Sequence, residues 1–156
     1  MLTDSVRAKI DEQIERTIHL IGLLPEHAGA SPVGELLGHL LDCMAGFCAV
    51  LYRAHPEELA HFESLRSLPV NQVCTPEAAC RGIATYRAHI HQGFDLLSDS
   101  DLGVRLQTIF VPEGETVLTL LLGNLEHLIN HKHQLFTYLK LMGVAVGTPD
   151  LYQFRG

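Results

Sequence analysis

Residues 124–143 read NLEHLINHKHQLFTYLKLMG, a run with no proline and with no glycine before its last position. Apolar side chains recur in and just before this run at steps of three and four residues, the period of an amphipathic helix. They are Leu121, Leu125, Leu128, Leu135, Leu139 and Met142. Gly143 follows them where a helix commonly stops. We therefore predict a long helix from Thr116 to Met142 with one face in the core.

Two of the three histidines in this helix point inward. His127 and His131 are one turn apart and fall within roughly 40° of each other around the helix axis. Two imidazoles so placed can bind one cation at Zn–N distances of about 2.0–2.1 Å. Interior histidines can also simply hydrogen-bond to each other or to a backbone carbonyl. His133 falls on the opposite side, so we expect it to be exposed and without a chemical role.

Composition indicates an ordinary globular chain. The 156 residues are 47% apolar and 19% charged, which fits one domain over 1–156 with a proper core. The formal charge is −7 and no Lys/Arg cluster stands out, which argues against a nucleic-acid partner. No run approaches the roughly 20 apolar residues of a membrane-spanning helix, so we expect no membrane association.

The cysteines favour a reducing compartment. There are four, Cys43, Cys48, Cys74 and Cys80, and their spacing matches no zinc ribbon. We find no signal peptide, and we therefore expect free, buried thiols in a reducing cytoplasm.

Helical periodicity recurs in three earlier segments, each with a start signal. The predicted helices cover residues 3–24, 32–53 and 75–97. Thr3 or Asp4 can cap the first, and Ser31 followed by Pro32 is a strong start for the second. Thr75, followed by proline and glutamate, repeats this pattern for the third.

The connections between these helices differ in character. Residues 55–73 are expected to form a short helix or turn followed by a loop. Residues 98–115 contain a short β-like segment that can make a hairpin or pack across the helices. The turn-rich tail should fold back and bury Tyr152 and Phe154. The predicted fold is all-α: a four-helix bundle with longer connections and a short irregular or β-like segment before the last helix.

His39, on the second helix, is a candidate third ligand. It lies at the margin of a buried stripe, where a histidine is more often a core or boundary residue. Facing side chains in a bundle core are, however, where metal sites are built. His39 could thus meet His127 and His131. Cys43, one turn from His39, is expected in the core, with a fourth-ligand or redox role as the alternative.

The chain resembles the DinB/YfiT-like superfamily of four-helix-bundle metalloenzymes over nearly its whole length. The early signature reads SPVGELLGHLLD around His39, and the late one reads HLINHKHQLFTYLKLMGV from His127. Lys132 stands at the family's basic position, and the Gln-Leu pair that follows is intact. His133 replaces a glycine usual in the family. The ending PDLY is also similar.

The resemblance implies a specific chemistry. His39, His127 and His131 would bind a divalent metal, zinc or nickel most often, and leave coordination positions open. Family members with an assigned activity tend to be thiol-dependent transferases or isomerases, which implies a low-molecular-weight thiol and a small electrophilic substrate. It also implies a homodimer. Neither catalytic residues nor thiol-binding residues can be identified.

Three functional hypotheses remain open. The chain is a metal-dependent thiol-S-transferase, a non-catalytic metal- or ligand-binding stress-response protein, or a structural dimer with vestigial histidines. A solvent-open pocket over the metal would favour the first, and a sealed site the second. No inward carboxylate is plainly paired with the histidines, since Glu126 points away. Di-iron carboxylate chemistry is disfavoured because none of the three candidate ligands has a glutamate three residues before it: the residues there are Leu36, Asn124 and Leu128.

Overall fold

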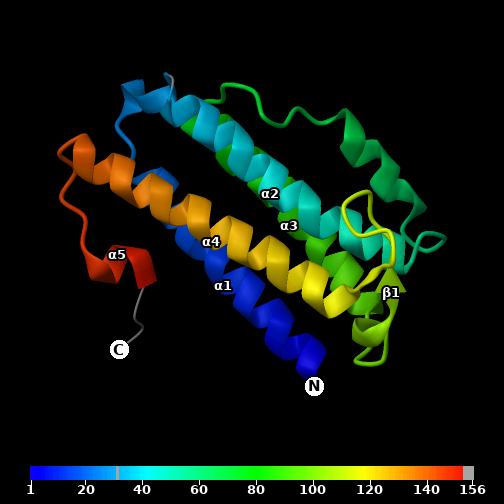
Figure 1. Cartoon of the computed structure of the whole chain (residues 1–156). Helices are drawn as coiled ribbons and strands as arrows, with labels where there is room; N and C mark the ends of the chain where they lie inside the picture. Colours follow the sequence, from blue (N-terminus) through cyan, green and yellow to red (C-terminus); the bar gives the residue numbers. More distant parts are fainter. Residues whose placement is uncertain (31, 153–156) are drawn as a thin grey trace.

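The computed structural model describes residues 1–30 and 32–152, most of which are helical (Figure 1). This confirms the all-α class. The long helices are α1 (Leu2–Gly22), α2 (Val33–Ala54), α3 (Pro76–Leu96) and α4 (Val117–Leu141). The short elements are the 3-10 turns η1 (Glu26–Gly29), η2 (Ala60–Ser67) and η3 (Asp101–Gly103), strands β1 (Arg105–Leu106) and β2 (Glu115–Thr116), and helix α5 (Thr148–Tyr152).

The four long helices share one core. Helix α2 packs against α3 and α4, and α1 packs against the same two helices. Figure 1 shows α4 running alongside both α1 and α2, with α3 behind α2. The predicted apolar stripe of the second helix is buried throughout: Leu36, Leu40, Cys43, Met44, Phe47 and Leu51. On α4, Met142 departs from prediction, since it is 37% exposed beyond the last helical turn.

The predicted β-like segment forms a hairpin, and only its base is paired. Strand β1 runs antiparallel to β2, with Arg105 opposite Thr116. Ile109 and Phe110 lie between the strands and are 89% and 87% exposed. The expectation that this segment packs across the helices is therefore wrong for these two side chains.

A loop distant in sequence caps the first helix. The backbone amides of Leu2 and Thr3 donate to the Asp99 carboxylate at 3.1 and 2.9 Å. These amides have no partner inside the helix, and a carboxylate at a helix N-terminus is also favoured by the helix dipole. The prediction of Thr3 or Asp4 as the cap is thus wrong. The predicted caps of the third and fourth helices, Thr75 and Thr116, are confirmed.

The tail folds back as predicted, and its anchor is a buried lysine. Helix α5 contacts α1, and Leu151 is 9% exposed. Lys132 of α4 is only 3% exposed, and its Nζ donates to Gln13 Oε1 at 2.8 Å and to the Leu151 carbonyl at 3.2 Å. Burial lowers the pKa of Lys132 to about 8. Tyr152, expected to be buried, is 44% exposed. The predictions for Ser31 and Phe154 lie outside the described residues.

Helix α2 is apolar enough to raise the question of a membrane. By length and composition it could cross one, contrary to the expectation that no segment would. However, 67% of its most apolar stretch is buried inside the protein. Core helices of soluble proteins have the same composition, so this feature is weak evidence for a membrane span.

Candidate metal centre

Three histidines from two helices meet between α2 and α4. His39 comes from α2, and His127 and His131 come from consecutive turns of α4. One ligand nitrogen from each ring lies within 4.8 Å of the other two, and all three residues are partly buried. The Nε2 atoms of His39 and His127 are 3.0 Å apart. The structure therefore brings together all three predicted ligands.

The loop that contains Asn71 orients the His39 ring through a hydrogen bond at Nδ1, the ring nitrogen that faces away from the other two histidines. His39 Nδ1 donates to Asn71 Oδ1 at 2.7 Å, which leaves Nε2 unprotonated and facing the other rings. Asn71 has φ of 57°, a left-handed conformation that asparagine tolerates. Its backbone amide donates to the Gly38 carbonyl at 3.0 Å. The loop thus sits directly against helix α2.

Two glycines of α2 make this close approach possible. A Cβ on Gly38 would lie 1.9 Å from the Gln72 carbonyl oxygen. A Cβ on Gly34 would lie 2.4 Å from the Gly29 carbonyl oxygen and 2.8 Å from the Val73 side chain. Real Cβ contacts are never this short, so both positions require glycine for the observed backbone. The loop that carries Asn71 can therefore reach His39 only because these side chains are absent.

His131 is oriented from its own helix. Its Nδ1 donates to Gln134 Oε1 at 2.9 Å, and Gln134 Nε2 donates in turn to the Tyr138 hydroxyl at 3.3 Å. This chain fixes the tautomer that leaves His131 Nε2 free. Metal-binding histidines usually donate their second N–H to such a partner.

His127 has a sulfur partner. Its Nδ1 lies 3.7 Å from Cys43 Sγ, and Cys43 is only 2% exposed. Burial and the charge of Asp42 raise the pKa of Cys43 to about 12, so its sulfur remains a thiol. Among the described residues the metal-type cluster contains only the three histidines. Cys43 is accordingly a core neighbour of the cluster, and the fourth-ligand alternative is not supported.

The electrostatics of the cluster favour the neutral form of His127. The pKa of His127 is lowered, chiefly by burial and also by its neighbours His131 and His39, against a smaller opposing effect of Asp42. A histidine must be neutral to bind a metal. In tetrahedral geometry at Zn–N of about 2.0–2.1 Å, two ligand nitrogens are about 3.4 Å apart. The 3.0 Å between His39 and His127 is close to this separation.

An open pocket of about 230 Å³ adjoins the histidines. His39 and His131 form part of its wall, and Gln134 and Tyr138 extend it along α4. Glu35, one turn before His39, also lines the pocket and is exposed. A small molecule can therefore reach two of the three ligand rings, with a carboxylate beside it. The histidine cluster is therefore open to solvent on this side rather than sealed.

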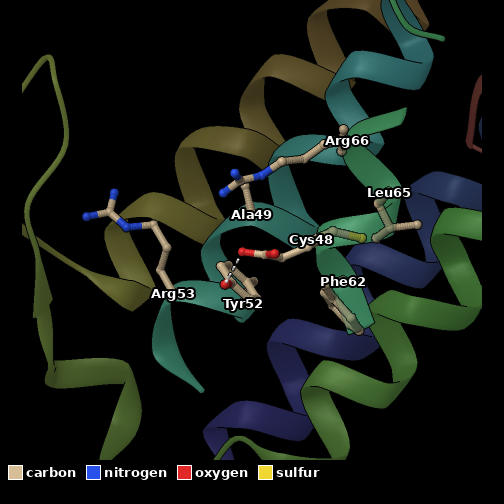
Figure 2. A pocket seen from close by; sticks show the side chains of 9 residues that line it. Cys48, Ala49, Tyr52, Arg53, Phe62, Leu65 and Arg66 are labelled. Carbon is tan, nitrogen blue, oxygen red and sulfur yellow. Dashed lines mark hydrogen bonds between the residues drawn. The ribbon is translucent and has the colours of Figure 1, made fainter. Parts of the chain in front are cut away.

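A second pocket lies between α2 and η2 (Figure 2). It measures about 200 Å³, with Cys48, Phe62 and Leu65 among its apolar lining. Tyr52 donates to Glu63 at 3.0 Å across it. Burial raises the pKa of Cys48 to about 12, so this thiol is not a ready nucleophile. The second pocket thus lacks the reactive groups found at the histidine cluster.

The sequence pattern identified the three candidate ligands but not the residues that surround and orient them. It assigned no role to Asn71, and it did not connect Glu35 with the site. The signal for Asn71 was the Gly34–Gly38 pair, since glycines four apart share one helix face and allow another backbone to approach. His133 is exposed and Glu126 faces solvent, as predicted. All four cysteines are free, as predicted, but only Cys43 and Cys48 are buried; the expected burial is wrong for Cys74 and Cys80, which are partly exposed.

Comparison with models of known protein families gave no match, and no curated protein matches the chain. The DinB-like resemblance therefore stays a prediction, and the functional argument depends on the geometry of the site.

Proposed function

We propose that this chain is a DinB-like four-helix bundle that binds one divalent metal ion, zinc or nickel, at His39, His127 and His131. The observation that carries the proposal is the convergence of the three rings, each with its Nδ1 beside a different partner. Asn71 and Gln134 hold two of the rings by hydrogen bonds, and Cys43 lies beside the third. Such supports are typical of metal-binding histidines.

We further propose that the protein is a metal-dependent thiol-S-transferase acting on small electrophiles. A bound divalent ion would lower the pKa of a low-molecular-weight thiol, so that a thiolate is available at neutral pH. The open pocket beside His39 and His131 gives the reactants access to the cluster, and Leu36 offers an apolar contact in its wall. The histidines act only as ligands in this scheme.

Glu35 is the residue of this chain best placed to move the proton. It lines the same pocket, and it lies one helical turn from His39. In the proposed reaction the thiol S–H bond breaks and Glu35 accepts the proton. The sulfur then forms a bond to carbon of the electrophile, and the leaving group departs with its bonding electrons. A water-exposed carboxylate can afterwards release the proton to solvent.

The second candidate is a non-catalytic metal- or ligand-binding stress-response protein. It keeps the three ligands and the pocket but performs no transfer. The observation that favours it is the exposure of Glu35, because water stabilises an exposed carboxylate and makes it a poor general base. In both versions we propose a cytoplasmic homodimer without a nucleic-acid or membrane partner.

Elemental analysis tests the metal site. The wild-type protein and its His127→Ala and His133→Ala variants are purified without added metal and without a histidine tag. We expect about one zinc or nickel ion per chain in the wild type and in His133→Ala, and almost none in His127→Ala. His133 is the matched control because it lies on the same helix but outside the cluster. Absence of metal from the wild type, with no uptake on addition, would refute the site.

A thiol assay then separates the two candidates. The metal-loaded protein is mixed with glutathione, bacillithiol or mycothiol and a chloronitrobenzene, whose thioether product absorbs light. Transfer above the uncatalysed rate, lost in His127→Ala, supports the transferase. Stoichiometric metal without turnover on any of these thiols supports the non-catalytic protein.

A further inference from the structure

A cleft of about 600 Å³ lies between α1, α4 and α5, away from the α2–α4 interface that holds the histidines. Helix α1 contributes Lys9 and Arg16 to its lining, α4 contributes Lys132, and α5 contributes Tyr152. Three cationic side chains therefore gather in one cleft of a chain whose formal charge is −7.

Two of these cations, Lys132 and Arg16, have N–H donors without an acceptor among the described residues. Lys132 is 3% exposed, and its ammonium group donates to two neutral acceptors, Gln13 Oε1 and the Leu151 carbonyl. An ammonium carries three donors, so one remains. The Nε atom of Arg16 is buried and has no acceptor within the described part of the chain. Buried donors without an acceptor are unfavourable, and an anion in the cleft would accept from the Lys132 ammonium and contact the Arg16 guanidinium, which also pairs with Glu12.

A single carboxylate, that of Glu12, is shared between two of the cationic side chains of the cleft. Glu12 pairs with Lys9 at 2.6 Å and also with Arg16. Lys132 has no carboxylate partner within hydrogen-bond distance among the described residues, and its two acceptors are both neutral. Within the described part of the chain, three cations in the cleft share one carboxylate partner, which leaves an excess of two positive charges. The excess is large enough to attract an anionic ligand carrying one or two charges.

We propose that this cleft binds a small organic anion through a carboxylate or phosphate group held by Arg16, Lys132 and Lys9. Ile129 and Leu151, with the Tyr152 ring, provide an apolar wall for the remainder of the ligand. Clefts of about 300–1,000 Å³ are the usual size for small-molecule sites. The site is independent of the metal, because it shares no lining residue with the pocket at His39 and His131.

Isothermal titration calorimetry at constant ionic strength tests this site, with inorganic phosphate and benzoate as probes. We expect at least one probe to bind the wild type, and Arg16→Gln to weaken it by about tenfold or more through loss of a charge-assisted hydrogen bond. Lys9→Gln should weaken it less, because Lys9 is half-exposed and screened by solvent. Preference for one probe identifies the anionic group.

Arg7→Gln is the matched control, since it removes one positive charge from α1 outside the cleft. Arg7 pairs with Asp95 instead. Binding should survive in Arg7→Gln and in the metal-site variant His127→Ala, which separates this site from the histidine cluster. Failure of both probes to bind the wild type, or equal weakening in Arg7→Gln and Arg16→Gln, would overturn the proposal and leave Lys132 as an anchor for α5. Circular dichroism of each variant verifies that it is folded.

Discussion

The Nε2 atoms of His39 and His127 lie 3.0 Å apart although 88 residues separate them in the chain. This contact requires α2 and α4 to pack in one register, and it requires the His39 ring to be turned toward α4. The Asn71 side chain supports that orientation from the opposite side of the ring. The geometry of the histidine cluster therefore depends on a loop that contributes none of the three histidines.

Gly38→Ala should destabilise the protein. The added Cβ would lie 1.9 Å from the Gln72 carbonyl oxygen, so the loop must move or the helix must shift. Overpacking against the backbone costs about 1–3 kcal/mol or more. Urea denaturation measures this loss in the free energy of unfolding, and metal affinity should fall with it because Asn71 is displaced.

Gly123→Ala makes the same change in α4, where among the described residues no heavy atom lies within 4 Å of the new Cβ. It should stabilise the protein by about 0.5–1 kcal/mol, since alanine is the better helix former. Equal effects of the two substitutions would show that the close approach of the loop to Gly38 does not exist in solution.

Asn71→Gly should weaken metal binding with little effect on the backbone. Glycine adopts the φ of 57° found at this position, so the substitution removes the acceptor for His39 Nδ1 without straining the loop. Loss of a hydrogen-bond partner behind a metal-binding histidine typically costs 10–100-fold in affinity, and about tenfold is expected here. Competition with a chromogenic chelator measures it.

Asn71→Asp is the companion variant. It retains an acceptor oxygen for His39, so its metal affinity should equal or exceed that of the wild type. If Asn71→Gly and Asn71→Asp bind metal alike, Asn71 does not orient the ligand.

The ligands on α4 were predictable because local periodicity determines which residues share a helix face. His127 and His131 follow from that rule alone. His39 needed one more step, namely that α2 and α4 face each other in a bundle, and the family resemblance pointed to the same residue. The helical class and most buried positions followed from the same apolar patterns.

The supports were not predictable because they depend on contacts between segments distant in sequence. Asn71 reaches His39 from a loop whose conformation is fixed by Gly34 and Gly38. Asp99 caps α1 from the connection after α3. Lys132 is buried because α5 folds over it, which no local pattern indicates. Hydrophobic periodicity identifies which face of a helix is buried. It does not indicate which helix a distant loop will contact, and these three contacts depend on that.

Asp101→Asn should reduce stability in a pH-dependent manner. The Asp101 carboxylate accepts hydrogen bonds from the Ser98 amide and hydroxyl, both at 2.8 Å, and from His55 at 3.2 Å. These partners, the Ser98 amide first, lower the pKa of Asp101. Because the folded-state pKa lies below the unfolded value of about 3.9, the stabilisation is complete above that pH and is lost as pH falls through the folded pKa.

Thermal or urea unfolding of wild type and Asp101→Asn from pH 7 to pH 3 measures this effect. We expect a difference of about 1 kcal/mol near pH 7 that shrinks toward zero in acid. Glu58 also lies near His55, at 3.8 Å, so Glu58→Gln serves as a control with a smaller effect. A difference that stays constant over the whole range would mean that ionisation of Asp101 contributes nothing to the fold.

Glu35→Gln tests the proton acceptor and depends on the proposed transferase activity. General-base catalysis typically contributes 10²–10⁴-fold, so turnover should fall by about 100-fold or more. Metal content should stay at the wild-type value, because Glu35 is not part of the histidine cluster. Glu126→Gln removes an exposed carboxylate one residue from a ligand and should leave turnover unchanged. If Glu35→Gln retains full turnover at every pH while His127→Ala is inactive, the proton leaves the thiol directly to solvent, and the chain contributes only ligands and a pocket to the reaction.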